Sequence, residues 1–150
     1  MPYLLGLLCL LSITFYCTLD CMPSLGMLTI NAFTASSSVL IPVQAEFLSA
    51  KGLELLTQTI MNVKEDLNPS LDFKGILYTM YSKNLIQTKT ILGFVNESYG
   101  KHVKIFDQKI PKSVKASEPC LVGQSAHVYD SKSSVSIAYE QFAKEVIAHG

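Results

Sequence analysis

The stretch that decides the fold is residues 37–80, SSVLIPVQAEFLSAKGLELLTQTIMNVKEDLNPSLDFKGILYTM. It begins and ends with largely apolar runs, residues 37–43 and 73–80, which are typical of buried strands in a parallel sheet. Between them, apolar residues recur at spacings of 3, 4, 3 and 4, namely Leu53, Leu56, Ile60, Val63 and Leu67. This spacing predicts one face of an amphipathic helix, which ends before Pro69 because proline disfavours helix at the preceding residue.

The same alternation continues on both sides of this stretch. Upstream, we expect a strand over residues 15–19, a turn at 20–24 and a short helix near 25–35. Downstream, Ile91, Phe94, Val95 and Tyr99 mark a helix that ends at Gly100, and residues 103–111 read as a fourth strand. The final helix is expected at residues 133–148, with Val135, Ala138, Phe142 and Val146 buried. The pattern predicts an α/β fold, with a mainly parallel sheet, flanking helices and right-handed crossovers.

Composition and charge narrow the class of protein. The chain has 150 residues, of which 49% are hydrophobic and 16% charged, so it is long and apolar enough for a sizeable core and unlike a disordered chain. Twelve acidic residues balance twelve basic ones, so the net charge points to no nucleic-acid or membrane partner. All twelve basic residues are lysine, which excludes an arginine finger and bidentate arginine readout of guanine from this chain.

The cysteines and histidines do not form a metal or disulfide pattern. Cys9, Cys17, Cys21 and Cys120 contain no C-x-x-C pair, and the three histidines are far apart in sequence. Structural zinc sites usually show short ligand spacing, so none is predicted here. We expect free, buried thiols in a reducing compartment.

Residues 1–19 carry no charge and contain long leucine runs, which leaves three interpretations open. A membrane span has the right length, but no basic residue flanks it and the first lysine is Lys51. A signal peptide would carry a basic residue before its apolar stretch and a small-residue cleavage site after it. The favoured interpretation is a buried strand over the second half, with residues 1–13 as an apolar leader whose role the sequence does not explain.

Asp20 directly follows that predicted strand. Ligands of parallel sheets bind outside the carboxyl ends of the strands, and a carboxylate there can hold Mg²⁺ beside a nucleotide's phosphates. A simple helix-capping role is the alternative for this aspartate.

Four segments of the chain resemble the ParA/MinD family of partitioning ATPases. Residues 19–46, LDCMPSLGMLTINAFTASSSVLIPVQAE, are similar to the family's strand and D-x-P-P-S-L-G turn. Three more follow in the family's order: LNPSLDFKGILYTMYSKN at 67–84, KIPKSVKASEP at 109–119 and VYDSKSSVSIAYEQFAKEVI at 128–147. The resemblance covers roughly residues 14–148 and is nearest to the Soj-like chromosome- and plasmid-partitioning branch.

This resemblance implies a deviant P-loop NTPase fold, which is Rossmann-like and similar to AAA and CbiA-type domains. It implies a cytoplasmic ATPase, nucleoid-associated, that binds ATP and Mg²⁺ and forms a homodimer around the nucleotide. It also implies non-specific DNA binding by that ATP-bound dimer and stimulation by a ParB-type partner, whereas a membrane partner is not expected.

Residue by residue, the resemblance assigns Asp20 to the Mg²⁺, through water. Pro23 matches the second proline of the turn. Thr79 and Met80 match the loop near the adenine, and Pro111 matches the proline that lines the base.

Two lysines match positions that carry arginine in the family. Lys112 and Lys115 are implied to contact DNA, with the charge kept and the bidentate geometry lost. They belong to a run of five lysines within residues 101–115, which reads either as a DNA-contacting surface or as an ordinary solvated loop. The family's Ser-Glu-Ala-Pro becomes Ser-Glu-Pro-Cys at 117–120, which alters this loop.

The phosphate-binding motif of the family is absent from the sequence. Neither G-x-x-x-x-G-K-[ST] nor K-G-G-x-x-K-[ST] occurs in the 150 residues, although such a loop supplies the amides and the lysine that hold the phosphates. Residues 14–150 are therefore predicted to be the C-terminal part of a ParA-type ATPase domain that is inactive alone. The alternative is a non-catalytic interaction module that docks on a full-length partitioning ATPase or its partner. A membrane-tethered variant is a third idea.

Overall fold

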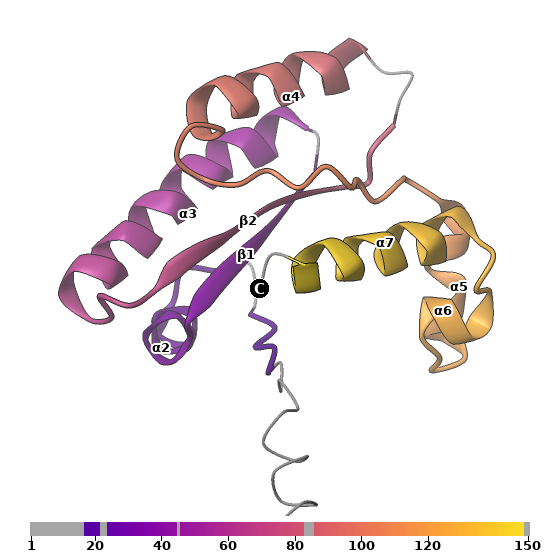
Figure 1. The fold of residues 1–150 in the computed structure, drawn as a ribbon, viewed down its shortest axis with the longest axis horizontal. Coiled ribbons are helices and arrows are strands. Elements are labelled where there is room, and N and C mark those ends of the chain that lie inside the picture. Colours follow the sequence, from indigo (N-terminus) through magenta and orange to yellow (C-terminus); the bar gives the residue numbers. More distant parts are fainter. Residues whose placement is uncertain (1–16, 22–23, 45, 83–85, 149–150) are drawn as a thin grey trace, which may run out of the picture.

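Two parallel strands, β1 (Ser38–Gln44) and β2 (Asp72–Thr79), run through the middle of the protein (Figure 1). The computed structural model describes residues 17–21, 24–44, 46–82 and 86–148. The strands pair from Ser38 beside Asp72 to Gln44 beside Thr79, with one shift in register where the pairing passes from Phe73 to Gly75. The helix between them makes this a β-α-β unit, as residues 37–80 predict.

A third segment continues the sheet on the far side of β2. Ile76 and Tyr81 form parallel bridges to Ile105 and Pro111, and the amide of Phe106 donates to the carbonyl of Ile76 at 3.0 Å. The fourth predicted strand is therefore present only as an extended segment held by separate bridges.

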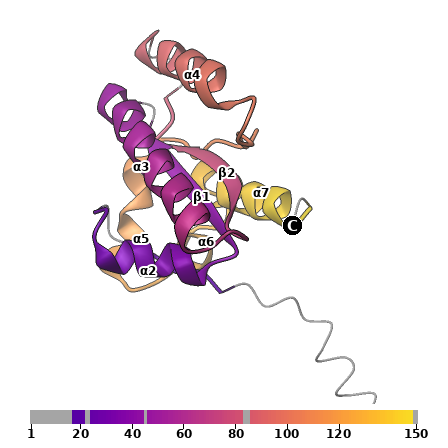
Figure 2. The ribbon, with the colours of Figure 1, turned by 90° about the vertical axis from the view of Figure 1, so that its left-hand side faces the viewer.

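Helices cover both faces of the strands. The structure gives α2 (Met27–Ala35), α3 (Phe47–Asp66), α4 (Ile86–Tyr99), a 3-10 helix η1 (Val114–Ala116), α5 (Glu118–Leu121), α6 (Ala126–Tyr129) and α7 (Ser134–Ala148). Figure 2 shows α3 and α7 on opposite sides of the two strands. The fold class predicted from the sequence is confirmed.

Each face of the strands has its own core. The first core joins β1 and β2 to α2, α3 and α4 around Ile41, Ile60, Ile76, Tyr78 and Val95. The second joins β2 and the third segment to α7 around Leu77, Phe106, Ile110, Val135 and Ala138, with Phe142 and Val146 packed against it. The rings of Phe106 and Phe142 meet edge to face, with 5.0 Å between their centroids.

Gly75 sets the approach of the third segment to β2. Its φ is +147°, and a Cβ built there would lie 2.6 Å from Cε2 of Phe106 and 2.8 Å from the carbonyl oxygen of Lys104. Neither the conformation nor the space suits a larger residue, so glycine is required here.

Asn68 ties the start of β2 to the end of α2. Its Nδ2 donates to the carbonyls of Phe33 at 3.0 Å and Ser36 at 2.8 Å, and its Oδ1 accepts from Ser70 at 2.7 Å. The last carbonyls of a helix lack the usual partner within the helix, and this buried amide serves Phe33 in the last turn of α2 and Ser36, the residue that follows it, from 35 and 32 residues away in the chain.

Several expectations from the sequence are wrong in detail. Residues 17–19 of the predicted strand 15–19 are exposed and outside any strand, while residues 15 and 16 lie outside the described residues. A strand needs a neighbour for its backbone groups, and no strand of the described part pairs with residues 17–19. Leu67 and Phe94 (56% exposed) follow the helical spacing yet remain at the surface.

The thiols also differ from expectation. Cys17 and Cys21 are free, as predicted, but exposed rather than buried, since they lie on the unpaired segment 17–21. No helix within the described ranges has both the length and the apolar character to cross a membrane.

Candidate functional site

The carboxyl ends of β1 and β2 lie at the same end of the sheet because the strands are parallel. Half-buried Thr79 ends β2, and Met80 follows with φ of 49°, a left-handed conformation that non-glycine residues seldom adopt. Met80 is 54% exposed. The backbone therefore turns sharply at the end of β2 and presents Met80 at the rim.

Tyr81 joins this turn to the segment that contains Pro111. The amide of Tyr81 donates to the carbonyl of Ile110 at 2.9 Å, and the amide of Lys112 donates to the carbonyl of Tyr81 at 3.0 Å. These two bonds bring together the turn at Thr79–Met80 and Pro111, which are about 30 residues apart in the sequence. The sequence resemblance grouped the same three residues, and the structure places them at one end of the sheet.

Two of the nearby lysines are committed to local interactions. Lys109 donates to the carbonyl of Asp107 at 3.1 Å, and its Nζ lies 5.9 Å from the centroid of the Tyr81 ring. The Nζ of Lys104 lies 3.9 Å from Oε1 of Glu145 and 4.9 Å from the ring centroid of Phe106. The lysine run at 101–115 is thus not a uniform basic surface, and Lys112 and Lys101 are its exposed members among the described side chains.

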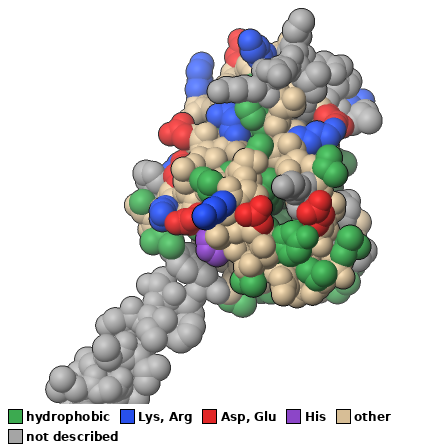
Figure 3. Space-filling model, turned by 90° about the vertical axis from the view of Figure 1, so that its right-hand side faces the viewer, with side chains coloured by type: hydrophobic (Ala, Val, Ile, Leu, Met, Phe, Trp, Pro, Cys, Tyr) green, Lys and Arg blue, Asp and Glu red, His purple; other side chains and the backbone are tan. Residues whose placement is uncertain are grey.

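Charges of both signs are interspersed on the face over α5, α6 and α7, with apolar patches between them (Figure 3). The exposed apolar residues of this region include Leu121, Val122 and Val128. The backbone of Lys115 lies in η1.

Asp20 stands apart from this edge. It is exposed on the unpaired segment 17–21, and no hydrogen bond or ion pair within the described residues links it to β1 or β2. Pro23 lies outside the described residues. The described residues also contain no group of three or more histidine, cysteine, aspartate or glutamate side chains that could hold a metal ion.

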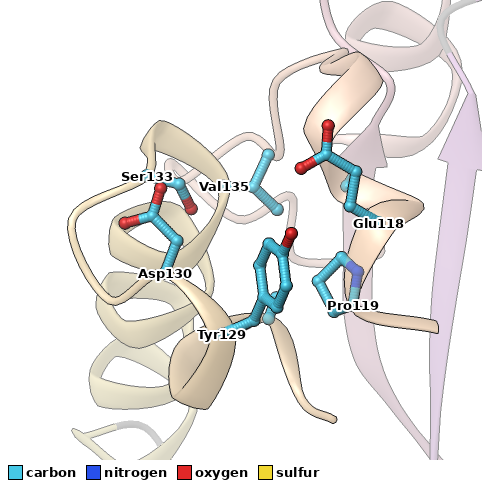
Figure 4. Close-up of a pocket in the computed structure, with 8 residues that line it drawn as sticks. Glu118, Pro119, Tyr129, Asp130, Ser133 and Val135 are labelled. Atoms are coloured by element: carbon cyan, nitrogen blue, oxygen red, sulfur yellow. The ribbon is translucent and has the colours of Figure 1, made fainter. Parts of the chain in front are cut away.

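A hollow of about 330 Å³ opens between η1, α5, α6 and α7 (Figure 4). Glu118 and Tyr129 face it from opposite sides, and Asp130 lies at its edge beside Ser133. Asp130 already accepts a hydrogen bond from the amide of Lys132 at 3.1 Å. Sequence reasoning found only the altered loop at 117–120, because the other walls come from separate helices.

Glu145 on α7 positions the segment that leads to Pro111. Its two carboxylate oxygens accept from the amides of Asp107 at 3.1 Å and Gln108 at 3.2 Å. With Lys104 nearby, this carboxylate links the last helix to the third segment of the sheet. Sequence reasoning missed Glu145, and no local motif marks it.

Tyr78 is a buried residue next to the last residue of β2. Its hydroxyl has no hydrogen-bond partner in the described part of the chain, and burial raises the pKa of Tyr78 to about 12. The phenol therefore stays neutral over the physiological range.

The residues present suit the base of a nucleotide better than its phosphates and metal. Met80 is exposed at the rim and Pro111 is half-buried, and apolar residues of this kind commonly line the sites of flat heterocycles. By contrast, the 150 residues hold no Gly-rich lysine loop, and Asp20 lies outside the paired strands. The arrangement does not make a complete site for a magnesium–nucleotide complex.

The comparisons with known proteins agree with this fold. A family model described as an AAA domain matches residues 14–73. The chain is 38% identical over 133 residues to the chromosome partitioning protein ParA of Caulobacter vibrioides, covering 89% of this chain and 49% of that protein. It is 41% identical over 138 residues to the sporulation initiation inhibitor protein Soj of Bacillus subtilis, covering 90% of this chain and 53% of Soj.

Solved structures with a similar fold also match this chain. Cobyrinic acid a,c-diamide synthase from Mycobacterium smegmatis, with bound ADP and magnesium, superimposes with a TM-score of 0.68 at 31% identity. The match covers 87% of this chain and 45% of that enzyme. A structure of the same enzyme with an ATP analog and magnesium matches equally well. The chain spans about half the length of the curated relatives that it matches.

Proposed function

Because this chain is homologous to the ParA and Soj partitioning ATPases over most of its length, we propose that residues 14–150 are the C-terminal part of such an ATPase domain. In this role it supplies the base-facing end of the nucleotide site and part of a DNA-contacting surface. The phosphate-binding half of the site is not encoded in these 150 residues.

The observation that carries the proposal is the joined edge at the end of β2. Thr79, Met80 and Pro111 are held at one end of the sheet by the hydrogen bonds of Tyr81 to Ile110 and Lys112. Ligands of parallel α/β sheets bind outside the carboxyl ends of the strands, which is where this edge lies. In the proposal, Met80 and Pro111 contact the adenine face and Thr79 borders it.

Asp20 has a separate proposed role at the metal. As an exposed carboxylate it is free to approach a hydrated Mg²⁺ once the rest of the nucleotide site is present. When bound, the magnesium would neutralise phosphate charge, which is the main source of catalysis in phosphoryl transfer. Without the phosphate loop, the chain alone is expected to give no ATP turnover.

The experiment that tests this function is a covalent chimera. Residues 14–150 replace the matched part of Bacillus subtilis Soj, and ATP hydrolysis is measured with and without DNA. We expect the chimera to hydrolyse ATP, while the 150-residue chain does not. A folded chimera that fails to bind ATP would contradict the proposal, as would turnover by the chain alone.

Matched variants in the chimera test individual residues. Asp20→Asn should abolish magnesium-dependent turnover, whereas Asp66→Asn, at the exposed end of α3, should leave it unchanged. Pro111→Gly should weaken nucleotide binding and leave DNA binding intact when ATP is saturating. Equal effects of the two aspartate variants would remove the metal role of Asp20.

The proposal extends to two partners, DNA and a ParB-type protein. Exposed Lys112, together with Lys115, is proposed to contact DNA phosphates, and a ParB-type protein is proposed to stimulate the assembled ATPase, which acts as a homodimer. Lys112→Ala in the chimera should reduce the slope of log K for DNA binding against log salt concentration by about one. Lys89→Ala on α4 should leave this slope unchanged. A cytoplasmic, nucleoid-associated location follows from these partners.

A second candidate function is a non-catalytic module that binds another polypeptide. The open edge of β1 is the observation that favours it, because within the described residues β1 pairs with β2 alone.

A further inference from the structure

The third segment of the sheet runs out of step with β2 just before it reaches the rim. In a regular parallel pair the hydrogen bonds are evenly spaced and advance by two residues on each strand. The carbonyl of Ile76 accepts from the amide of Phe106 at 3.0 Å. Two residues further along β2, the carbonyl of Tyr78 accepts from the amide of Ile110 at 2.9 Å, four residues further along the segment. Two extra residues therefore bulge out of the third segment, and we call residues 107–109 the 107–109 bulge.

A second irregularity lies at the end of β2 itself. After Tyr78, the next carbonyl that accepts from the third segment is that of Tyr81, which takes the amide of Lys112 at 3.0 Å. The chain that continues β2 thus advances by three residues while the third segment advances by two. The one extra residue falls within residues 79–80, where Met80 has the left-handed φ of 49°.

Together the two irregularities determine which side chain of the third segment reaches the rim. They leave a net shift of one residue, in agreement with the two isolated bridges to this segment. Successive side chains of a strand point to opposite faces, so a shift of one residue exchanges the faces. With the shift, Ile110 is buried in the second core and half-buried Pro111 lies opposite Tyr81.

The 107–109 bulge is held from α7. The amides of Asp107 and Gln108 donate to the two carboxylate oxygens of Glu145 at 3.1 and 3.2 Å. Carbonyls of the bulge are served by its own side chains, since Lys109 Nζ donates to Asp107 and Gln108 Nε2 donates to Lys109, each at 3.1 Å. Of the described residues, Glu145 alone accepts from these two amides, so the form of the bulge depends on the last helix.

Lys104 supplies the counter-charge of the Glu145 carboxylate. Its Nζ is buried, has no hydrogen-bond partner in the described part of the chain, and lies 3.9 Å from Oε1 of Glu145. The side chain of Glu145 is only 17% exposed. Charge-assisted hydrogen bonds are about twice as strong as neutral ones. A neutral side chain at position 145 would therefore weaken the hold on the bulge and leave Lys104 without its counter-charge.

We propose that Glu145 is a positioning residue for nucleotide binding. By holding the 107–109 bulge from α7, it maintains the register that brings Pro111 opposite Tyr81, and it thereby sets the affinity of the rim for the base. The inference rests on the proposed function for the identity of this ligand, since Met80 and Pro111 are proposed there to contact adenine. Docking of α7 and binding of the base then stabilise each other, because such coupling is reciprocal.

Hydrogen exchange of the full 150-residue chain tests the structural step. Glu145→Gln keeps the shape of the side chain but places a donor where one oxygen accepts. Exchange should become about tenfold faster at the amides of Tyr81 and Lys112, which pair at the rim, and stay unchanged at Ile60 in the first core. Glu140→Gln is the matched control on the same helix, because its carboxylate pairs with an exposed lysine one turn away. It should leave all three amides unchanged.

Nucleotide binding by the Soj chimera tests the functional step. Glu145→Gln should raise the KM for ATP about tenfold and leave kcat within about twofold, as expected when only a contact to the base is weakened. Inhibition by inorganic tripolyphosphate, which has no base, should be unchanged. Glu140→Gln should behave as the wild-type chimera in both measurements.

Several outcomes would overturn the inference. Unchanged exchange at Tyr81 and Lys112 would show that the bulge does not control the rim, and equal acceleration at Ile60 would show a general loss of stability. An unchanged KM for ATP, or an equal loss of inhibition by tripolyphosphate, would also reject it. A wild-type chimera that binds no ATP contradicts the proposed function instead, and the exchange result on the 150-residue chain then still decides whether Glu145 positions the rim.

Discussion

Asn68→Asp is the substitution whose effect follows most directly from the structure. It keeps the size of the side chain and the oxygen that accepts from Ser70, but removes the Nδ2 donor that serves Phe33 and Ser36. It also places a carboxylate against the carbonyls at the end of α2, the negative end of that helix.

The magnitude can be worked from these contacts. Each of the two hydrogen bonds is worth about 1 kcal/mol, and a buried acceptor left without a donor adds about 1–3 kcal/mol. We expect a loss of about 3–5 kcal/mol in the free energy of unfolding, a large share of the roughly 5–15 kcal/mol typical of a domain. Urea denaturation followed by circular dichroism measures it.

The control is the same chemical change at an exposed position. Asn62 on α3 accepts from Gln58 at 3.0 Å, and an aspartate there keeps the acceptor, so Asn62→Asp should cost less than about 0.5 kcal/mol. If Asn68→Asp also falls below about 0.5 kcal/mol, Asn68 does not hold α2 in the way described.

Three further substitutions test the strands and α7. Gly75→Ala should destabilise the protein by about 2–4 kcal/mol, because the added Cβ meets the ring of Phe106. Gly93→Ala is the control: a Cβ there meets open space, so it should stabilise the protein by up to about 1 kcal/mol. Thermal unfolding of the two variants measures the difference. The pKa of Tyr78 is about 10 in the unfolded chain and about 12 in the fold, so wild type should lose stability above pH 10 and Tyr78→Phe should remove that loss. Unfolding midpoints of both proteins at pH 9 and pH 11 measure it. Equal changes in midpoint between the two pH values would contradict the prediction. Glu145→Gln should cost about 1–2 kcal/mol and speed hydrogen exchange at the amides of residues 107 and 108. Unchanged exchange there would show that the Glu145 carboxylate does not hold these amides.

The regular elements were predictable because their signals are local. The spacing of Leu53, Ile60 and Val63 identified α3, and the apolar runs identified β1 and β2. The same rule failed at Phe94, which stays exposed while Ile91 and Val95 of the same helix pack into the first core. It failed at residues 17–19 because an apolar run becomes a strand only beside a partner.

The candidate site was predictable only in part. Thr79, Met80 and Pro111 came from a family resemblance, and the hydrogen bonds of Tyr81 account for why they meet. The carboxylate of Glu145 serves amides 37 and 38 residues away, and the hollow beside Tyr129 has walls from four elements. Such long-range pairings leave no pattern in a single sequence.

The division of the interior into two cores has a kinetic consequence. The first core holds β1, β2 and α2–α4, while α7 is fastened through the second core around Phe106 and through Glu145. Only β2 and its neighbouring segment contribute to both, so α7 can detach while the β-α-β unit stays folded. We therefore expect the protein to unfold as two cooperative units, with α7 the first of these helices to exchange its amides with solvent.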